Sequence, residues 1–263
     1  MKKYNLTMEL YVKYKEEKSK QKFVDALIKN MKPTAIGFAG FKTRGGLQHH
    51  ALRKNMFDNA KDKIENRIYN EKIIKTISRS TIKQCKQVFA LKNVYLFIFP
   101  CFSVFVRKKM NGVMGESPYK NTILIFINPT VKGWKEALKG TITHEYAHAV
   151  TYHFHTWQTL RDSLFFEGLA ENFVEMVQGK TNPWAKQISY TESKKFFQKL
   201  KKYLNSRKSK IYREIFFGSK KYPLWLGYSL GYYLVKDYTQ NNKKSWKEIV
   251  KTSPQKVIDK SGF

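Results

Sequence analysis

The feature that most restricts the fold is a change of pattern at Pro129. Before it, residues 93–128 contain short runs dense in β-branched and aromatic residues, which are typical of strands. After it, apolar residues recur with helical spacing. The strand candidates are VYLFIF (94–99), FSVFV (102–106) and TILIFIN (122–128), and the helix candidates are 134–153, 161–178, 190–206 and 223–240. A small sheet beside a mainly helical lobe predicts an α+β fold.

The first ninety residues have a weaker pattern. Residues 1–15 alternate apolar and polar side chains, which suits a strand, although a helix explains them nearly as well. Residues 16–30 and 47–88 have helical spacing, and the proline and glycines between these segments indicate a loop. We therefore expect the N-terminal region to be mainly helical.

The sequence His144-Glu145-Tyr146-Ala147-His148 lies inside the helix predicted over 134–153. Helix positions four apart lie about 40° apart around the axis and one turn along it, so both imidazoles can reach one cation. Glu145 projects roughly a quarter turn from His144, where it can act on a water beside the metal without being a ligand. The same pattern would arise by chance in roughly one such chain in a hundred, so a merely structural motif is the weaker alternative.

A second acidic motif, Glu167-Gly168-Leu169-Ala170-Glu171, lies on the next predicted helix. The interval after His148 allows a helix to end, a loop to turn and a second helix to return, so Glu167 can supply a third ligand. Glu171 is one turn further on the same face and can reach the second nitrogen of a ligating histidine. The alternative is a solvated pair of acidic side chains.

These motifs resemble those of gluzincin metallopeptidases, in which HExxH is followed by a more distant glutamate. More narrowly, HEYAHAV, EGLAENFVE and GYSLGYYLV resemble a bacterial family of predicted Zn-dependent proteases (domain of unknown function 2268). The resemblance covers roughly residues 93–240. It implies that His144, His148 and Glu167 bind one Zn²⁺ per chain and that Glu145 activates water. His and carboxylate ligands would also accept other divalent first-row metals.

The resemblance also implies a fold and a division of the chain. We expect a zincin-like arrangement, in which a small mixed sheet packs on the active-site helix. On this prediction residues 1–92 form the mainly helical N-terminal region and residues 93–180 the catalytic core. Residues 181–263 then form a C-terminal helical lobe that closes the active-site cleft.

Hydrolysis of an amide also needs a donor for the oxyanion, and gluzincins commonly use a downstream tyrosine or histidine. Tyr228 is the first candidate and Tyr232 the second. The alternative for both is burial on the apolar face of the helix predicted over 223–240.

The gluzincin resemblance implies that an edge strand before the zinc helix pairs with peptide substrate, and residues 122–128 occupy that place in the sequence. Residues 112–116, Gly-Val-Met-Gly-Glu, are only partly similar to the GxMEN motif of aminopeptidases in this clan. The glutamate is displaced and the asparagine is missing. We therefore expect an endopeptidase, and the sequence identifies no substrate-binding residue.

The charge of the chain offers a different function. Fifty Lys and Arg against twenty Asp and Glu give a net charge of +30, which attracts polyanions. The alternative is therefore a nucleic-acid or anionic-surface binding protein whose metal site is structural or vestigial. Lysine is spread along the whole chain, as a compositional bias would make it, and the acid-free stretch 194–213 has a helical apolar stripe. We expect at most weak polyanion binding.

The compartment follows from cysteine usage and hydropathy. The two cysteines, Cys85 and Cys101, are too few for a disulfide framework. Charged residues interrupt the apolar run that a signal peptide would need, and no run approaches the ~18 apolar residues of a membrane span. We expect a cytoplasmic protein without a transmembrane segment.

Overall fold

The computed structural model describes residues 5–10, 22, 25, 29, 40–43, 45, 46 and 69–263. The chain divides into two compact units, residues 1–149 and 150–263. The helix expected over 16–30 and the first part of the helix expected over 47–88 fall almost entirely outside the described residues, whereas residues 71–88 are helical. The three-part division at residues 92 and 180 remains a prediction.

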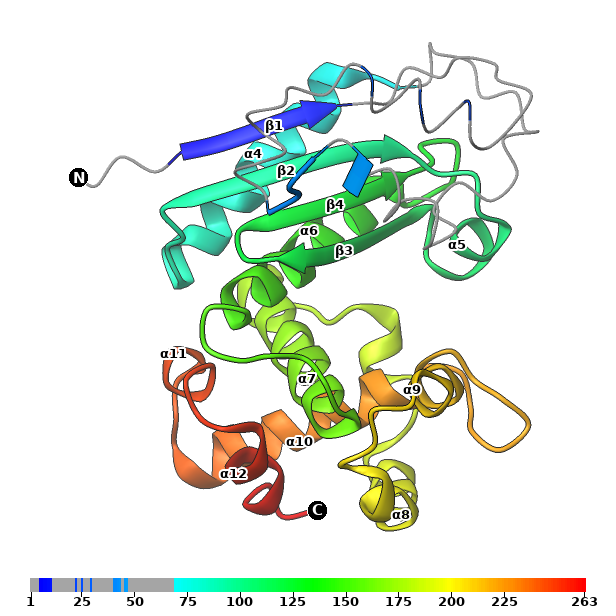
Figure 1. The fold of residues 1–263 in the computed structure, drawn as a ribbon, viewed down its shortest axis with the longest axis vertical. Coiled ribbons are helices and arrows are strands. Elements are labelled where there is room, and N and C mark those ends of the chain that lie inside the picture. The colour runs from blue at the N-terminus through cyan, green and yellow to red at the C-terminus, as the bar shows by residue number, and fades with distance from the viewer. Residues whose placement is uncertain are drawn as a thin grey trace. The chain divides into compact units, whose positions relative to one another are not determined.

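A four-stranded mixed sheet is the framework of the first unit (Figure 1). The strand order is β1-β2-β4-β3, in which β1, β2 and β4 are parallel and β3 is antiparallel to β4. The strands are β1 (Asn5–Leu10), β2 (Asn93–Pro100), β3 (Val113–Tyr119) and β4 (Thr122–Ile127). The α+β class is confirmed, as is the strand interpretation of residues 5–10.

The strand β4 lies inside the sheet, not at its edge. Every one of its residues is buried, and Phe126 stacks on Phe99 of β2 with ring centroids 5.3 Å apart. A continuous apolar run is typical of a strand covered on both faces. The prediction that residues 122–128 form an edge strand is wrong, because β4 pairs with β2 on one side and β3 on the other. In the part of the chain that the structure describes, β1 and β3 are the edge strands.

Two segments near the sheet differ from the sequence prediction. The run FSVFV predicts a strand, but Val104–Lys109 form the helix α5, because Ser103 caps its first turn by accepting a hydrogen bond from the Val106 N–H. The glycine-containing segment at 112–116 predicts a loop, but most of it belongs to β3. The turn before β3 uses Gly112 at φ 78°, where an added Cβ would lie 2.6 Å from the Asn128 carbonyl oxygen. Only glycine fits there.

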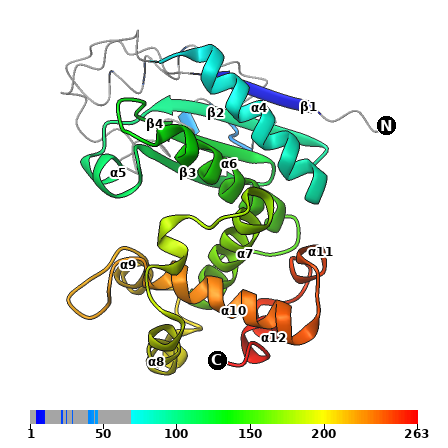
Figure 2. The same cartoon turned by 180° about the vertical axis from the view of Figure 1, so that it is seen from behind.

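The helices α4 (Glu71–Val88) and α6 (Trp134–Thr151) cover the same face of the sheet (Figures 1 and 2). Residues 140–151 of α6 are all buried. The Tyr146 hydroxyl donates to the Phe89 carbonyl at 2.7 Å and accepts from the Leu91 N–H at 3.1 Å. These two bonds attach α6 to the chain that joins α4 to β2.

The second unit is helical, and α7 (Leu160–Gln178) and α10 (Leu226–Asn242) form its centre. They approach closely at two glycines: a Cβ on Gly231 would lie 2.5 Å from the Leu164 carbonyl oxygen and 3.0 Å from the Gly168 nitrogen. The glycine in EGLAE suggests close packing of Gly168 against the helix that carries the histidines, but the atoms nearest to an added Cβ belong to Gly231 and Val235 of α10. The other elements are η2 (Pro183–Lys186), α8 (Tyr190–Leu200), η3 (Lys201–Tyr203), α9 (Ser209–Phe216), α11 (Trp246–Ile249) and α12 (Pro254–Asp259).

The acid-free stretch 194–213 begins in α8, which ends earlier than the predicted 206. Phe197 and Leu200 are buried, whereas Lys195 and Lys199 on the same helix are exposed. This is the amphipathic, solvated helix face that the sequence favours. None of the described helices combines the length and the apolar composition needed to cross a membrane.

Candidate metal centre

Two imidazoles of α6 point their nitrogens at each other. The Nε2 atoms of His144 and His148 lie 2.9 Å apart, and the rings meet edge to face with centroids 4.6 Å apart. Both side chains are buried, at 6% and 4% exposure. Their spacing along one helix follows from the helical repeat, as the sequence predicts. Two buried Nε2 atoms that converge in this way offer two ligands to one cation.

A carboxylate from α7 completes a group of three donors. One atom from each of His144, His148 and Glu167 lies within 4.8 Å of the others, and all three residues are buried. The α7 helix begins with a capping box, in which the Thr159 hydroxyl and the Asp162 carboxylate each accept a hydrogen bond from the other's N–H. The capping box fixes the residue at which α7 begins and therefore the position of Glu167 along the helix.

The donor set suits zinc. Two imidazole nitrogens and one carboxylate oxygen are the ligand types that catalytic zinc sites use, with a further position left for water. Burial of these three polar side chains together costs free energy unless a bound cation compensates for their lost contacts with water. The residues present therefore fit a divalent metal, and the ligand types favour zinc without excluding other first-row metals.

Glu145 lies next to His144 on α6 and is 5% exposed. Its carboxyl group lies against the backbone of β3: a Cβ built on Gly115 would be 2.7 Å from Glu145 Oε1 and 2.8 Å from Cδ. The main-chain carbonyl of Glu145 accepts a 2.7 Å hydrogen bond from the Ser117 hydroxyl. Sequence reasoning identified Glu145 but missed both β3 residues, because nothing in the spacing of residues 112–119 indicates a contact with α6.

Glu171 is fully buried one turn after Glu167. Its carboxylate accepts a 2.6 Å hydrogen bond from the Trp184 indole N–H and longer ones, 3.2 and 3.3 Å, from the Asn182 amide. A solvated acidic side chain is therefore the wrong description of this residue. Its predicted action on a ligating histidine remains a prediction. Neither Asn182 nor Trp184 belongs to a recognisable motif, so no sequence signal identifies this pair.

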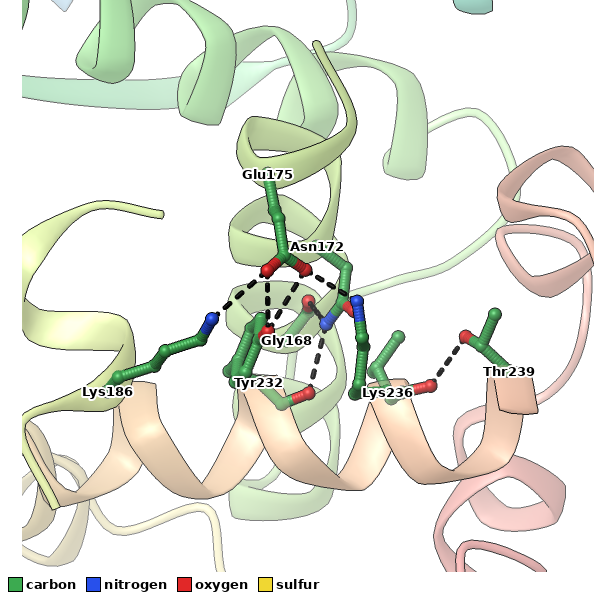
Figure 3. A network of polar contacts seen from close by, with 8 residues as sticks. Gly168, Asn172, Glu175, Lys186, Tyr232, Lys236 and Thr239 are labelled. Atoms are coloured by element: carbon green, nitrogen blue, oxygen red, sulfur yellow. Dashed lines mark hydrogen bonds and ion pairs between the residues drawn. The ribbon is translucent and has the colours of Figure 1, made fainter. Parts of the chain in front are cut away.

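The two candidate tyrosines of α10 have different surroundings. The Tyr232 hydroxyl donates to the Glu175 carboxylate, with both oxygens at 3.0 Å, and burial is the main cause that raises its pKa to about 12 (Figure 3). Tyr228 is half-buried and packs edge to face on Phe216, with ring centroids 5.2 Å apart. Tyr228 also contacts the rings of Trp184 and Trp225. The Tyr232 hydroxyl is thus engaged with Glu175, and the role of Tyr228 as oxyanion donor remains a prediction.

Glu175 is the centre of a polar network that joins α7, η2 and α10 (Figure 3). Its carboxylate accepts hydrogen bonds from Lys236 at 2.6 Å and Lys186 at 3.1 Å. Burial raises the pKa of this carboxyl, but the bonds from the two lysines outweigh burial and the net shift is downward. The Asn172 amide bridges the same helices by donating to the carbonyls of Gly168 at 2.8 Å and Tyr232 at 3.0 Å.

Comparison with known proteins points to one family. No curated protein and no solved structure gives a significant match to the chain. A family model described as "Predicted Zn-dependent protease (DUF2268)" matches residues 74–259, which include the His144, His148 and Glu167 group, about half of the first compact unit and nearly all of the second. The chain therefore belongs to this family of predicted Zn-dependent proteases.

Proposed function

We propose that this protein is a zinc-dependent endopeptidase. The observation that carries the proposal is the buried group of His144, His148 and Glu167, whose donor atoms lie within 4.8 Å of one another. Membership in a family of predicted Zn-dependent proteases supports the same conclusion. In this proposal the three side chains hold the metal and Glu145 is the general base.

In the proposed mechanism the Glu145 carboxylate carries the proton that the attacking water loses. When bound, zinc supplies a Lewis acid that acidifies water and polarises a peptide carbonyl. A carboxylate oxygen of Glu145 accepts the proton of the attacking water and passes it to the nitrogen of the leaving amine. Glu145 is buried, so few competing waters solvate this carboxylate.

Two further residues have proposed roles. Glu171 orients a ligating histidine, and its bonds from Trp184 and Asn182 support that role because they hold the carboxylate in one orientation. Tyr228 donates a hydrogen bond to the oxyanion. We expect Tyr228→Phe to lower kcat by about 100-fold. Tyr232→Phe is the matched control, and an equal loss in both variants would argue against the assignment.

The substrate in this proposal is an extended peptide. Since β3 is one of the two edge strands of the described sheet and lies against Glu145, an extended chain that pairs with β3 would bring its carbonyl groups near the general base. The partly matching GxMEN segment belongs to this strand. Its missing asparagine supports cleavage within chains over removal of terminal residues.

The metal is tested by mass spectrometry on protein purified without chelator or affinity metal. We expect about one zinc per chain in the wild type and loss of this zinc in Glu167→Ala. The matched control is Glu175→Gln, which removes the charge of another α7 carboxylate, one bonded to lysines, and should retain zinc. Wild-type protein without zinc, even after zinc is supplied, would overturn the proposal.

The general base is tested in the same preparations. Glu145→Gln should retain the zinc of the wild type and lose hydrolysis of a mixed peptide library by about 1,000-fold or more. Hydrolysis at the wild-type rate in Glu145→Gln would contradict the proposed role of this residue.

A further inference from the structure

The strand β3 contacts Glu145 at two points. The Ser117 hydroxyl bonds to the main-chain carbonyl of Glu145 at 2.7 Å, and Gly115 lies against the Glu145 side chain. The strand thus touches the backbone and the side chain of a single residue of α6.

The space taken by Glu145 is what requires glycine at position 115. The three heavy atoms nearest to an added Cβ all belong to Glu145, with Oε1 at 2.7 Å and Cδ at 2.8 Å. The backbone does not impose glycine, because the φ of Gly115 lies outside the positive range. The irregularity of β3 also lies elsewhere, between Glu116 and Tyr119, whereas Gly115 pairs regularly with Ile125.

An added methyl group would move the side chain of Glu145 more readily than the strand. The main chain of Gly115 is in register with β4, an interior strand whose residues are all buried. The Glu145 side chain has three rotatable bonds, so its carboxyl group can swing away at a lower cost than displacement of a paired strand. The carboxylate therefore occupies its present position only while residue 115 lacks a side chain.

We infer that Gly115 is a positioning residue for Glu145, with its bare backbone face setting where the carboxylate lies. The contact between Gly115 and Glu145 does not depend on the proposed function, whereas its effect on catalysis rests on that function. A displacement of about 1 Å at a catalytic group can lower the rate by about 100-fold. Sequence motifs assign no role to this glycine, since its partial likeness to GxMEN concerns recognition of a free amino terminus.

Thermal unfolding of four proteins tests the contact: wild type, Gly115→Ala, Glu145→Ala and the double variant. In the wild-type background Gly115→Ala should lower Tm by about 4 °C, because the methyl group overlaps Glu145. In the Glu145→Ala background the same change should raise Tm by about 1 °C, because alanine restricts the unfolded chain more than glycine does. If Gly115→Ala alone fails to fold, recovery of folding in the double variant supports the inference. An equal change of Tm in both backgrounds overturns it.

Zinc content and steady-state kinetics test the positioning role. Gly115→Ala should retain about one zinc per chain and lower kcat on the peptide library by about 100-fold with little change in KM. The control is Gly46→Ala, at an exposed glycine whose added Cβ would meet only Thr43 Oγ1 at 3.7 Å, and it should match the wild type. Full kcat in Gly115→Ala overturns the inference. Failure of the proposed function would look different. The wild type would then lack zinc and hydrolysis, while the Tm values of the four proteins would still report the contact between Gly115 and Glu145.

Discussion

The helix that carries the histidine pair and the helix that carries Glu167 are held by different means. In the first unit α6 is buried along residues 140–151 and is attached by the uncharged hydroxyls of Tyr146 and Ser117. In the second unit α7 is also mostly buried, and it additionally relies on the close approach of Gly168 to α10 and on the charged network around Glu175. Apolar burial tolerates small changes, whereas a backbone contact between glycines tolerates none. The two halves of one candidate metal group should therefore respond differently to mutation.

The largest effect should come from the glycine contact of the second unit. Gly231→Ala places a methyl group against the backbone of Leu164 and Gly168, which cannot move aside without separating α7 from α10. We expect a loss of about 3 kcal/mol in the free energy of unfolding, measured by urea denaturation. The comparison variant is Gly227→Ala on the same helix, where the nearest atoms belong to the Phe216 ring and can rotate. A larger loss in Gly227→Ala than in Gly231→Ala would contradict this interpretation.

The next effect concerns the attachment of α6. Tyr146→Phe removes the buried hydroxyl that donates to the Phe89 carbonyl and accepts from the Leu91 N–H. We expect a loss of about 2 kcal/mol in unfolding free energy, again from urea denaturation. Zinc content should not change. A loss below about 0.5 kcal/mol would show that these bonds contribute little, and that burial alone holds α6.

A smaller effect should follow from breaking the charged network. Glu175→Gln removes its ion pairs with Lys236 and Lys186, whose side chains are 36% and 47% exposed, so screening by solvent limits the loss to about 1 kcal/mol. Because the pKa of Glu175 is lowered in the folded state, its contribution is present above the unfolded value of 4.5 and is lost as pH falls further. Tm measured against pH should therefore show the wild type and Glu175→Gln converging below pH 4.5. A gap between the two that stays constant down to low pH would contradict the ionic explanation.

The smallest effect on the free energy of unfolding is expected at the surface of α6. Lys139 and Glu136 form an exposed ion pair at 2.7 Å near the start of the helix. Lys139→Ala should change the free energy of unfolding by less than about 0.5 kcal/mol, because solvent weakens such pairs. Salt titration of Tm provides the check, and a clear salt-dependent loss would mean that α6 also depends on surface charge.

Much of the candidate site was predictable because its residues act through local spacing. The HExxH pattern places two imidazoles on one face of a helix whatever the rest of the chain does, and a helix that follows it can return Glu167 to them. The strands β2 and β4 were predictable for a similar reason, since dense β-branched and aromatic runs pack well only in a buried sheet. These inferences need only the neighbouring residues.

Contacts between distant segments were not predictable from the sequence. The strand β3 contains Gly115 and Pro118 and is stabilised by pairing with β4, so its own residues predict a loop. Its place as the edge strand follows from the crossing of the chain between β2 and β4. Likewise, α5 replaces a predicted strand because β2 has already ended when Ser103 caps the next turn.

The available chemistry can be read from local spacing along the chain: a histidine pair at helical spacing, a third donor on the next helix and a carboxylate beside them. The groups that surround this chemistry are known only from the fold. It places Gly115 and Ser117 against Glu145, and Trp184 with Asn182 against Glu171. The physical reason is that helical periodicity is written in neighbouring residues, whereas the packing of a strand or a loop on a helix depends on the path of the whole chain.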